Sequence, residues 1–120
     1  MDESWDSFVT ECRKRLLKAR QDRLNGMRDL EPALKSEVTG DEGDMAQTLT
    51  DQHTALTRRE KIVKELGEIA DALVRLEVGT YGVCEETEEP IERQRLLALP
   101  WTRLSLIGAE IRETRQKRFA

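Results

Sequence analysis

Two long segments of this chain repeat apolar residues at helical spacing, and a short acidic link separates them. In the first, from Asp6 to about Lys35, the apolar steps are mostly three and four residues long: Phe8, Cys12, Leu16, Ala19, Met27, Leu30 and Leu34. The second runs from Asp44 to about Glu77 with a single interior glycine. Because a short link makes successive helices run antiparallel, the pattern predicts a helical hairpin.

The second segment also fits a heptad repeat. One predicted core position holds Leu49, Leu56, Val63 and Ala70, and the other holds Gln52, Arg59, Leu66 and Leu73. The seam is thus polar near the start of the helix and apolar near its end, so the loosest packing is expected at the free end of the hairpin. Pro32 removes a backbone hydrogen bond near the end of the first segment, where we expect a kink.

After residue 77 the pattern changes to a turn-rich stretch, a run of glutamates and a dense apolar segment from Leu96 to Ile107. A last helix is expected from about Arg103 to Arg118. The predicted fold is therefore mainly all-α: a long antiparallel two-helix coiled-coil hairpin plus a small globular knot with a C-terminal helix. Residues 1–77 would form the hairpin, with its tip at about 38–46, and residues 78–120 the small domain.

Composition narrows the possible functions. The 120 residues are 38% hydrophobic, 37% charged and 4% aromatic, which is too little apolar material for a large enzyme with a deep pocket. A net charge of -4 argues against free nucleic acid as the main ligand, because phosphate neutralisation supplies most non-specific affinity. An acidic start and the lack of a long apolar run predict a cytoplasmic protein without membrane contact.

The chemistry-bearing residues are few. Cys12 and Cys84 form no disulfide framework, and the single histidine, His53, has no second ligand at helical spacing. Glu85 and Glu86 are expected to raise the pKa of the Cys84 thiol, which disfavours a nucleophilic role. With no nucleophile–base pair and no set of metal ligands, the chain is not expected to be an enzyme.

The link between the helices carries the most informative polar cluster, formed by Glu37, Asp41, Glu42 and Asp44. Asp44 is a natural N-cap for the second helix, and acidic residues in a first turn favour the helix dipole. A cap needs only one residue, however. The remaining carboxylates of this acidic hairpin tip are therefore also suited to entering a confined site that is basic or contains a metal ion.

Three local patterns together resemble the DksA/TraR family of bacterial transcription factors. The tip residues 41–46, DEGDMA, fit the family's D-x-x-D-x-A signature. Residues 79–85, GTYGVCE, resemble the entry to its zinc finger, and Ile91 with residues 95–100, RLLALP, resembles the middle of the finger. Residues 109–113, AEIRE, resemble the terminal helix. The resemblance covers about residues 41–118 and, more loosely, the first helix.

The family's finger places four cysteines around zinc, and here the match fails. Counted from Cys84, the other three ligand positions hold Thr87, Ser105 and Gly108. One thiolate cannot hold a structural zinc ion, so the chain is similar to zinc-free members of the family and no metal is expected. We expect the apolar stretch around Leu96 to offset the missing metal by packing.

The resemblance implies a regulator of transcription, active in the stringent response, that binds RNA polymerase rather than a specific DNA sequence. Family members insert the hairpin through the polymerase secondary channel and bring the acidic tip near the catalytic magnesium centre. Asp41, Asp44 and Ala46 match the family's tip determinants. A monomer is expected.

Many members also act together with guanosine tetraphosphate bound between the factor and polymerase. Lys61 stands where the family has a basic contact, but Glu68, Leu99 and Ala109 replace other expected basic residues. Since a carboxylate and two apolar side chains offer little to an anionic nucleotide, weakened or absent synergy is expected.

Two alternatives stay open. A cytosolic coiled-coil adapter would bury the hairpin seam against another helix, although the polar residues Gln52, His53 and Arg59 disfavour that interface. A Gre-like transcript-cleavage factor shares the hairpin and the acidic tip, while the finger remnant beside Cys84 favours the DksA/TraR interpretation.

Overall fold

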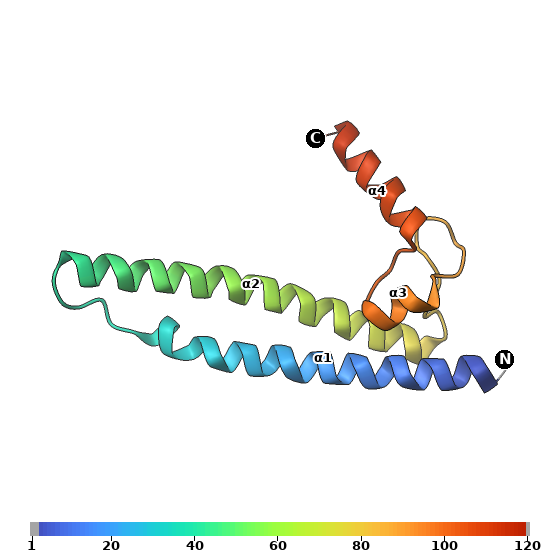
Figure 1. Ribbon diagram of the computed structural model, residues 1–120, viewed down its shortest axis with the longest axis horizontal. Helices are drawn as coiled ribbons and strands as arrows, with labels where there is room; N and C mark the ends of the chain where they lie inside the picture. Colours follow the sequence, from blue (N-terminus) through green and yellow to red (C-terminus); the bar gives the residue numbers. More distant parts are fainter. Residues whose placement is uncertain (1–2, 120) are drawn as a thin grey trace. The chain divides into compact units, whose positions relative to one another are not determined.

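The computed structural model describes residues 3–119, which form four α-helices (Figure 1). The two long ones come first, and two shorter ones follow: α1 Glu3–Lys35, α2 Glu42–Val78, α3 Arg93–Ala98 and α4 Leu106–Phe119. Within the described range the only extended pairing is an isolated antiparallel bridge between Val83 and Pro90. The predicted all-α class and the two-helix hairpin are confirmed. None of the helices in this range is long and apolar enough for a bilayer crossing.

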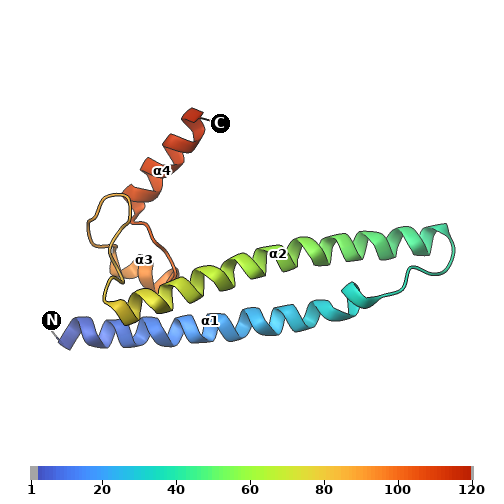
Figure 2. The same ribbon diagram turned by 180° about the vertical axis from the view of Figure 1, so that it is seen from behind.

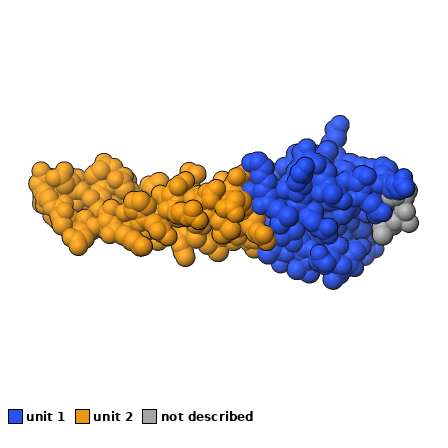
Figure 3. Space-filling view, turned by 90° about the horizontal axis from the view of Figure 1, so that it is seen from below, with its two compact units in different colours: residues 1–18, 68–120 blue, residues 19–67 orange. Residues whose placement is uncertain are grey.

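The chain divides into two compact units, coloured separately in Figure 3. Unit 1 combines residues 1–18 with residues 68–120, and unit 2 comprises residues 19–67. The beginning of α1 and the end of α2 therefore group with the C-terminal segment, while the rest of both helices and the link between them form the second unit.

The core of unit 1 joins side chains from three helices and the loop after α2. Its largest fully buried members are Leu16, Ile69, Leu96, Cys12 and Cys84. Beside Cys12 lies the buried ring of Tyr81, whose hydroxyl donates a hydrogen bond of 2.8 Å to the Pro100 carbonyl. Burial, followed by the hydrogen bond to Cys12, raises the pKa of Tyr81 above its ordinary value. Cys12 is thus a core residue.

The apolar stretch from Leu96 to Ile107 does not pack as expected. Leu96 is buried, but Leu99, Leu106 and Ile107 are 38%, 56% and 64% exposed. The last two lie in the first turn of α4, where the N–H groups of Leu106 and Gly108 donate to the side chains of Glu92 and Ser105.

In unit 2, the C-terminal half of α1 packs against the N-terminal half of α2. Ala55 and Ile62 of α2 are buried at this contact, and the backbone of Gly26 on α1 lies close to the Ile62 side chain. The Arg23 guanidinium pairs with Glu65 across the two helices at 2.8 Å, with both side chains about one quarter exposed.

One of the two predicted heptad positions is wrong. Leu49, Leu56 and Val63 are 55%, 50% and 47% exposed, and Ala70 is exposed as well. The residues one place earlier, Ala55, Ile62 and Ile69, are buried instead. The other predicted position holds in part, since Gln52, Leu66 and Leu73 are half-buried whereas Arg59 is exposed.

Pro32 lies inside α1, close to its end at Lys35. The last turn of α1 is directed away from the axis of the preceding turns in both views (Figures 1 and 2). Proline cannot donate to the carbonyl four residues earlier, which accounts for the bend. Just after the end of α1, the Ser36 hydroxyl donates a hydrogen bond of 2.8 Å to the Pro32 carbonyl.

Candidate functional site

The hairpin tip, residues 38–46, is shaped by the start of α2. The Asp41 carboxylate accepts a hydrogen bond of 2.8 Å from the Asp44 backbone N–H, and the Asp41 carbonyl accepts one of 2.9 Å from the Met45 N–H. Asp41 is therefore the N-cap of α2, and the prediction that Asp44 fills this role is wrong. The helix begins at Glu42, two residues before the predicted Asp44, because the first aspartate in the cluster already caps it.

Capping leaves the two aspartates in different states. The Asp41 carboxylate is held by the backbone, whereas no described residue donates a hydrogen bond or ion pair to the carboxylate of Asp44. Gly40, with φ +96°, makes room for it: a Cβ there would come within 2.8 Å of the Asp44 side chain. Ala46 is exposed in the next turn of the helix.

Lys61 lies on α2 in unit 2, 15 residues after the last tip residue, Ala46. It lines an open groove of about 810 Å³ together with Arg23, His53, Arg58 and Glu65. Lys61 is exposed, and the groove mixes basic side chains with the acidic Asp22 and Glu65. Glu65 in the same groove is already paired with Arg23.

The four positions of the finger, in contrast, do converge. The Ser105 hydroxyl donates to the Cys84 sulfur over 3.4 Å and accepts a hydrogen bond of 3.0 Å from the Gly108 N–H. The Thr87 hydroxyl lies close enough to the Cys84 sulfur to help lower the pKa of that thiol. Cys84 and Ser105 are buried, at 1% and 5% exposure. The residues that the resemblance assigns to the finger positions thus lie together around the Cys84 sulfur.

The residues at this place do not fit a zinc ion. Only Cys84 brings a soft ligand, Thr87 and Ser105 bring hydroxyls, and Gly108 brings no side chain. The backbone has also closed on the site, because a Cβ on Gly108 would stand 2.4 Å from the Cys84 sulfur. Within residues 3–119, no three His, Cys, Asp or Glu side chains gather as metal ligands could.

The hydroxyl groups change the acidity of the thiol. Burial raises the pKa of Cys84, but hydrogen bonds from Ser105 and Thr87 outweigh it and lower the pKa to about 6. The expectation that Glu85 and Glu86 would raise this pKa is wrong, because both carboxylates pair with arginines instead.

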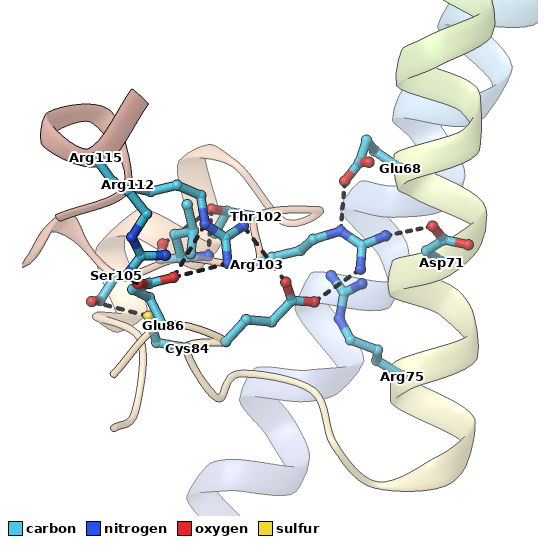
Figure 4. Close-up of polar contacts among 12 residues, drawn as sticks. Glu68, Asp71, Arg75, Cys84, Glu86, Thr102, Arg103, Ser105, Arg112 and Arg115 are labelled. Atoms are coloured by element: carbon cyan, nitrogen blue, oxygen red, sulfur yellow. Dashed lines mark hydrogen bonds and ion pairs between the residues drawn. The ribbon is translucent and has the colours of Figure 1, made fainter. Parts of the chain in front are cut away.

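Beside the finger lies a network of ion pairs that sequence reasoning missed (Figure 4). Arg103, in the loop before α4, contacts Glu68 on α2 at 3.0 Å, Glu85 at 2.9 Å and Asp71 on α2. Hydrogen bonds to Glu85 and then to Glu68 raise the pKa of the Arg103 guanidinium. Arg75 of α2 lies beside this cluster and donates a hydrogen bond of 3.2 Å to the Trp101 carbonyl.

The network continues to the C-terminal helix. Arg112 of α4 pairs with Glu86 at 3.2 Å and with Glu85 at 3.7 Å, and Arg115 pairs with Glu86 as well. Partial burial raises the pKa of Glu86, but hydrogen bonds from Arg112 and Arg115 outweigh it and lower the pKa overall. The signal was present in the sequence as an acidic run followed by a helix rich in arginine.

The other positions where basic residues were expected have different surroundings. Glu68 is occupied by Arg103, Leu99 is 38% exposed, and Ala109 at the start of α4 is half-buried. None of these three side chains can offer positive charge. Of the four positions considered for nucleotide contact, Lys61 in the groove of unit 2 is the one that carries a positive charge.

The structure combines a two-helix hairpin that has a capped acidic tip with a small finger-like segment. Comparison with known proteins shows which family has these features. The model of the prokaryotic dksA/traR C4-type zinc finger matches residues 79–106. The RNA polymerase-binding transcription factor DksA of Caulobacter vibrioides is 35% identical over 107 residues, which cover 88% of this chain and 75% of that protein. The chain belongs to the DksA/TraR family.

Two further relatives agree with this assignment. The solved structure of transcription factor DksA2 from Pseudomonas aeruginosa matches with a TM-score of 0.79 and 34% identity, covering 98% of this chain and 89% of that one. General stress protein 16O of Bacillus subtilis is 36% identical over 73 residues, 61% of this chain and 45% of that protein. The names of the two DksA relatives describe transcription factors rather than enzymes.

Proposed function

We propose that this chain binds RNA polymerase and modulates transcription initiation, without recognising a DNA sequence, by inserting its hairpin tip through the secondary channel. Membership of the DksA/TraR family and a relative named as RNA polymerase-binding support the partner. The protein would act as a monomer in the cytoplasm and serve in the stringent response.

The observation that carries the proposal is the state of Asp44. Asp41 caps α2 and fixes the turn, while the carboxylate of Asp44 is exposed and has no partner among the described residues. In a confined channel of low dielectric, such a carboxylate interacts with a cationic centre far more strongly than in water. The small exposed side chain of Ala46 lets the tip approach closely.

The test is transcription from a ribosomal promoter with purified polymerase and either Asp44→Asn or Glu42→Gln. Each variant removes one charge from the first turn of α2 with little change of shape, and both positions are exposed. Binding to polymerase is measured in parallel, so that loss of docking is separated from loss of tip action. The proposal requires Asp44→Asn to lose activity while it still binds.

The same assay separates the alternatives. A Gre-like factor would stimulate cleavage of the nascent transcript, and this activity is expected to be absent because capping already engages one of the two tip aspartates. One observation favours a coiled-coil adapter, namely the exposed row Leu49, Leu56 and Val63 at heptad spacing. An adapter would be indifferent to the charge of Asp44.

We further propose that the finger folds without zinc and that guanosine tetraphosphate adds little to its action. The single thiol and the closed backbone at Gly108 support the first statement. The ion pair that occupies Glu68 and the absence of positive charge at Leu99 and Ala109 support the second. Both follow from replaced side chains rather than from a different fold.

A further inference from the structure

The C-terminal helix α4 has little apolar contact to hold its direction. Leu106, Ile107 and Ile111 are 56%, 64% and 41% exposed, and beyond Gly108 no described side chain of α4 is fully buried. Helices in proteins are normally oriented by burying an apolar face, and α4 does not do so. Something other than hydrophobic packing must orient it within unit 1.

Hydrogen bonds from backbone N–H groups to Glu92 and Ser105 fix the first turn of α4. The Leu106 N–H donates to the Glu92 carboxylate at 3.1 Å, and Ser105 caps the Gly108 N–H at 3.0 Å. These contacts locate the start of the helix, but a helix held at one end can still pivot. In a metal-bound finger, two ligands on each side would resist that rotation.

A second set of contacts lies one to two turns further along α4. Glu86 receives Arg112 at 3.2 Å and Arg115, and its carboxylate side chain is only 10% exposed. Glu85 bridges Arg112 and Arg103, and Arg103 reaches Glu68 and Asp71 on α2. Charged groups thus alternate in an unbroken path from α2 through the finger loop to α4 (Figure 4).

We propose that Glu86 and Arg103 are positioning residues: the ion-pair path that they form sets the direction of α4 relative to the end of α2, in place of a metal ion. Arg103 suits this role because a guanidinium presents a rigid fork of donors to several carboxylates at once. Glu86 suits it because its carboxylate receives Arg112 and Arg115 together, from two successive turns of α4. The inference concerns the free protein and goes beyond the proposed function.

The experiment measures residual dipolar couplings of backbone amides in α4 and in residues 69–78 of α2, for the wild type and for Glu86→Gln. We expect the residual dipolar couplings of α4 to fall by roughly a third in Glu86→Gln, because order parameters differ by about that much between a rigid and a flexible backbone. The couplings of α2 should not change. Chemical shifts report separately whether α4 is still helical. Glu113→Gln is the matched control, since it removes the same charge but breaks only an exposed pair with Lys117.

Salt supplies a readout that a simple packing role would not move. Asp71, Glu85 and Arg115 in the path are 59%, 40% and 58% exposed, so salt can screen them. The Debye length falls from about 10 Å at 0.1 M to about 3 Å at 1 M salt, and salt should therefore loosen α4 in the wild type but add little in Glu86→Gln. This titration needs no variant and stays decisive if Glu86→Gln misfolds. Unchanged couplings in Glu86→Gln, or a wild-type α4 indifferent to salt, would overturn the proposal and leave the polymerase assays untouched.

Discussion

Ser105 donates a hydrogen bond to the sulfur of Cys84 across 3.4 Å, and both side chains are buried between the finger loop and the start of α4. The same hydroxyl accepts the Gly108 N–H, so its donor and its acceptor are both used. At the position where the resemblance expects a finger ligand, Ser105 caps α4, and hydrogen bonds join the loop to the helix where a C4-type finger uses metal–thiolate bonds.

Chelation should leave the stability of this protein unchanged. The finger offers one thiolate, and its backbone closes on the Cys84 sulfur at Gly108, so we expect EDTA to find no metal to remove. Thermal unfolding with and without EDTA checks this, alongside elemental analysis of the purified protein. A relative with four finger cysteines serves as the positive control. A fall of several degrees in Tm, or zinc at a one-to-one ratio, would contradict the account.

Gly108→Ala should destabilise the protein by about 1–3 kcal/mol, the usual cost of forcing an extra methyl group into a closed core. Its Cβ would lie 2.4 Å from the Cys84 sulfur and 3.2 Å from the Ser105 oxygen. Gly67→Ala is the control, because nothing lies within 4 Å of that Cβ and alanine favours a helix interior by about 0.5–1 kcal/mol. Chemical denaturation measures both, and equal effects would refute the described packing.

Neighbouring residues on α2 test the register of the hairpin. Ile62→Ala should cost about 2–4 kcal/mol because the side chain is 7% exposed and packs beside Gly26. Val63→Ala, at 47% exposure, should change the free energy of unfolding by no more than about 0.5 kcal/mol. The opposite order in urea unfolding would restore the heptad assignment predicted from the sequence.

Guanosine tetraphosphate should produce little or no synergy in a purified polymerase assay. Glu68 is neutralised by Arg103, and Leu99 and Ala109 provide no charge for a phosphate. Lys61→Ala should therefore leave the response to the nucleotide unchanged within error. Full synergy in the wild type that disappears in Lys61→Ala would show that this single lysine is sufficient and that the account is wrong.

Periodicity predicted the hairpin well because two amphipathic helices repeat the same signal over many turns. It misplaced one heptad position because Leu49, Leu56 and Val63 look like core residues, whereas the contact actually uses Ala55 and Ile62, where the helices approach closely. Counting side-chain size cannot reveal such a close approach, which depends on a glycine on the partner helix.

The finger shows the same limit. The family resemblance suggested Cys84, Thr87, Ser105 and Gly108 as the four finger positions, and the structure places Cys84, Ser105 and Gly108 in contact. The ion pairs of Arg103 could not be predicted, since they join residues that are far apart in the sequence and depend on three-dimensional placement. Opposite charges were visible, but their pairing was not.

The lifetime of a ribosomal promoter complex, measured with Asp44→Asn and Glu42→Gln at matched occupancy of polymerase, tests the central claim most directly. Asp44 offers an exposed carboxylate with no partner among the described residues, while Glu42 differs from it by one methylene and lies in the same turn. The account predicts that Asp44→Asn binds polymerase but loses most of the effect on lifetime, and that Glu42→Gln retains it. Equal activity of Asp44→Asn and the wild type would remove the tip from the mechanism and contradict the account.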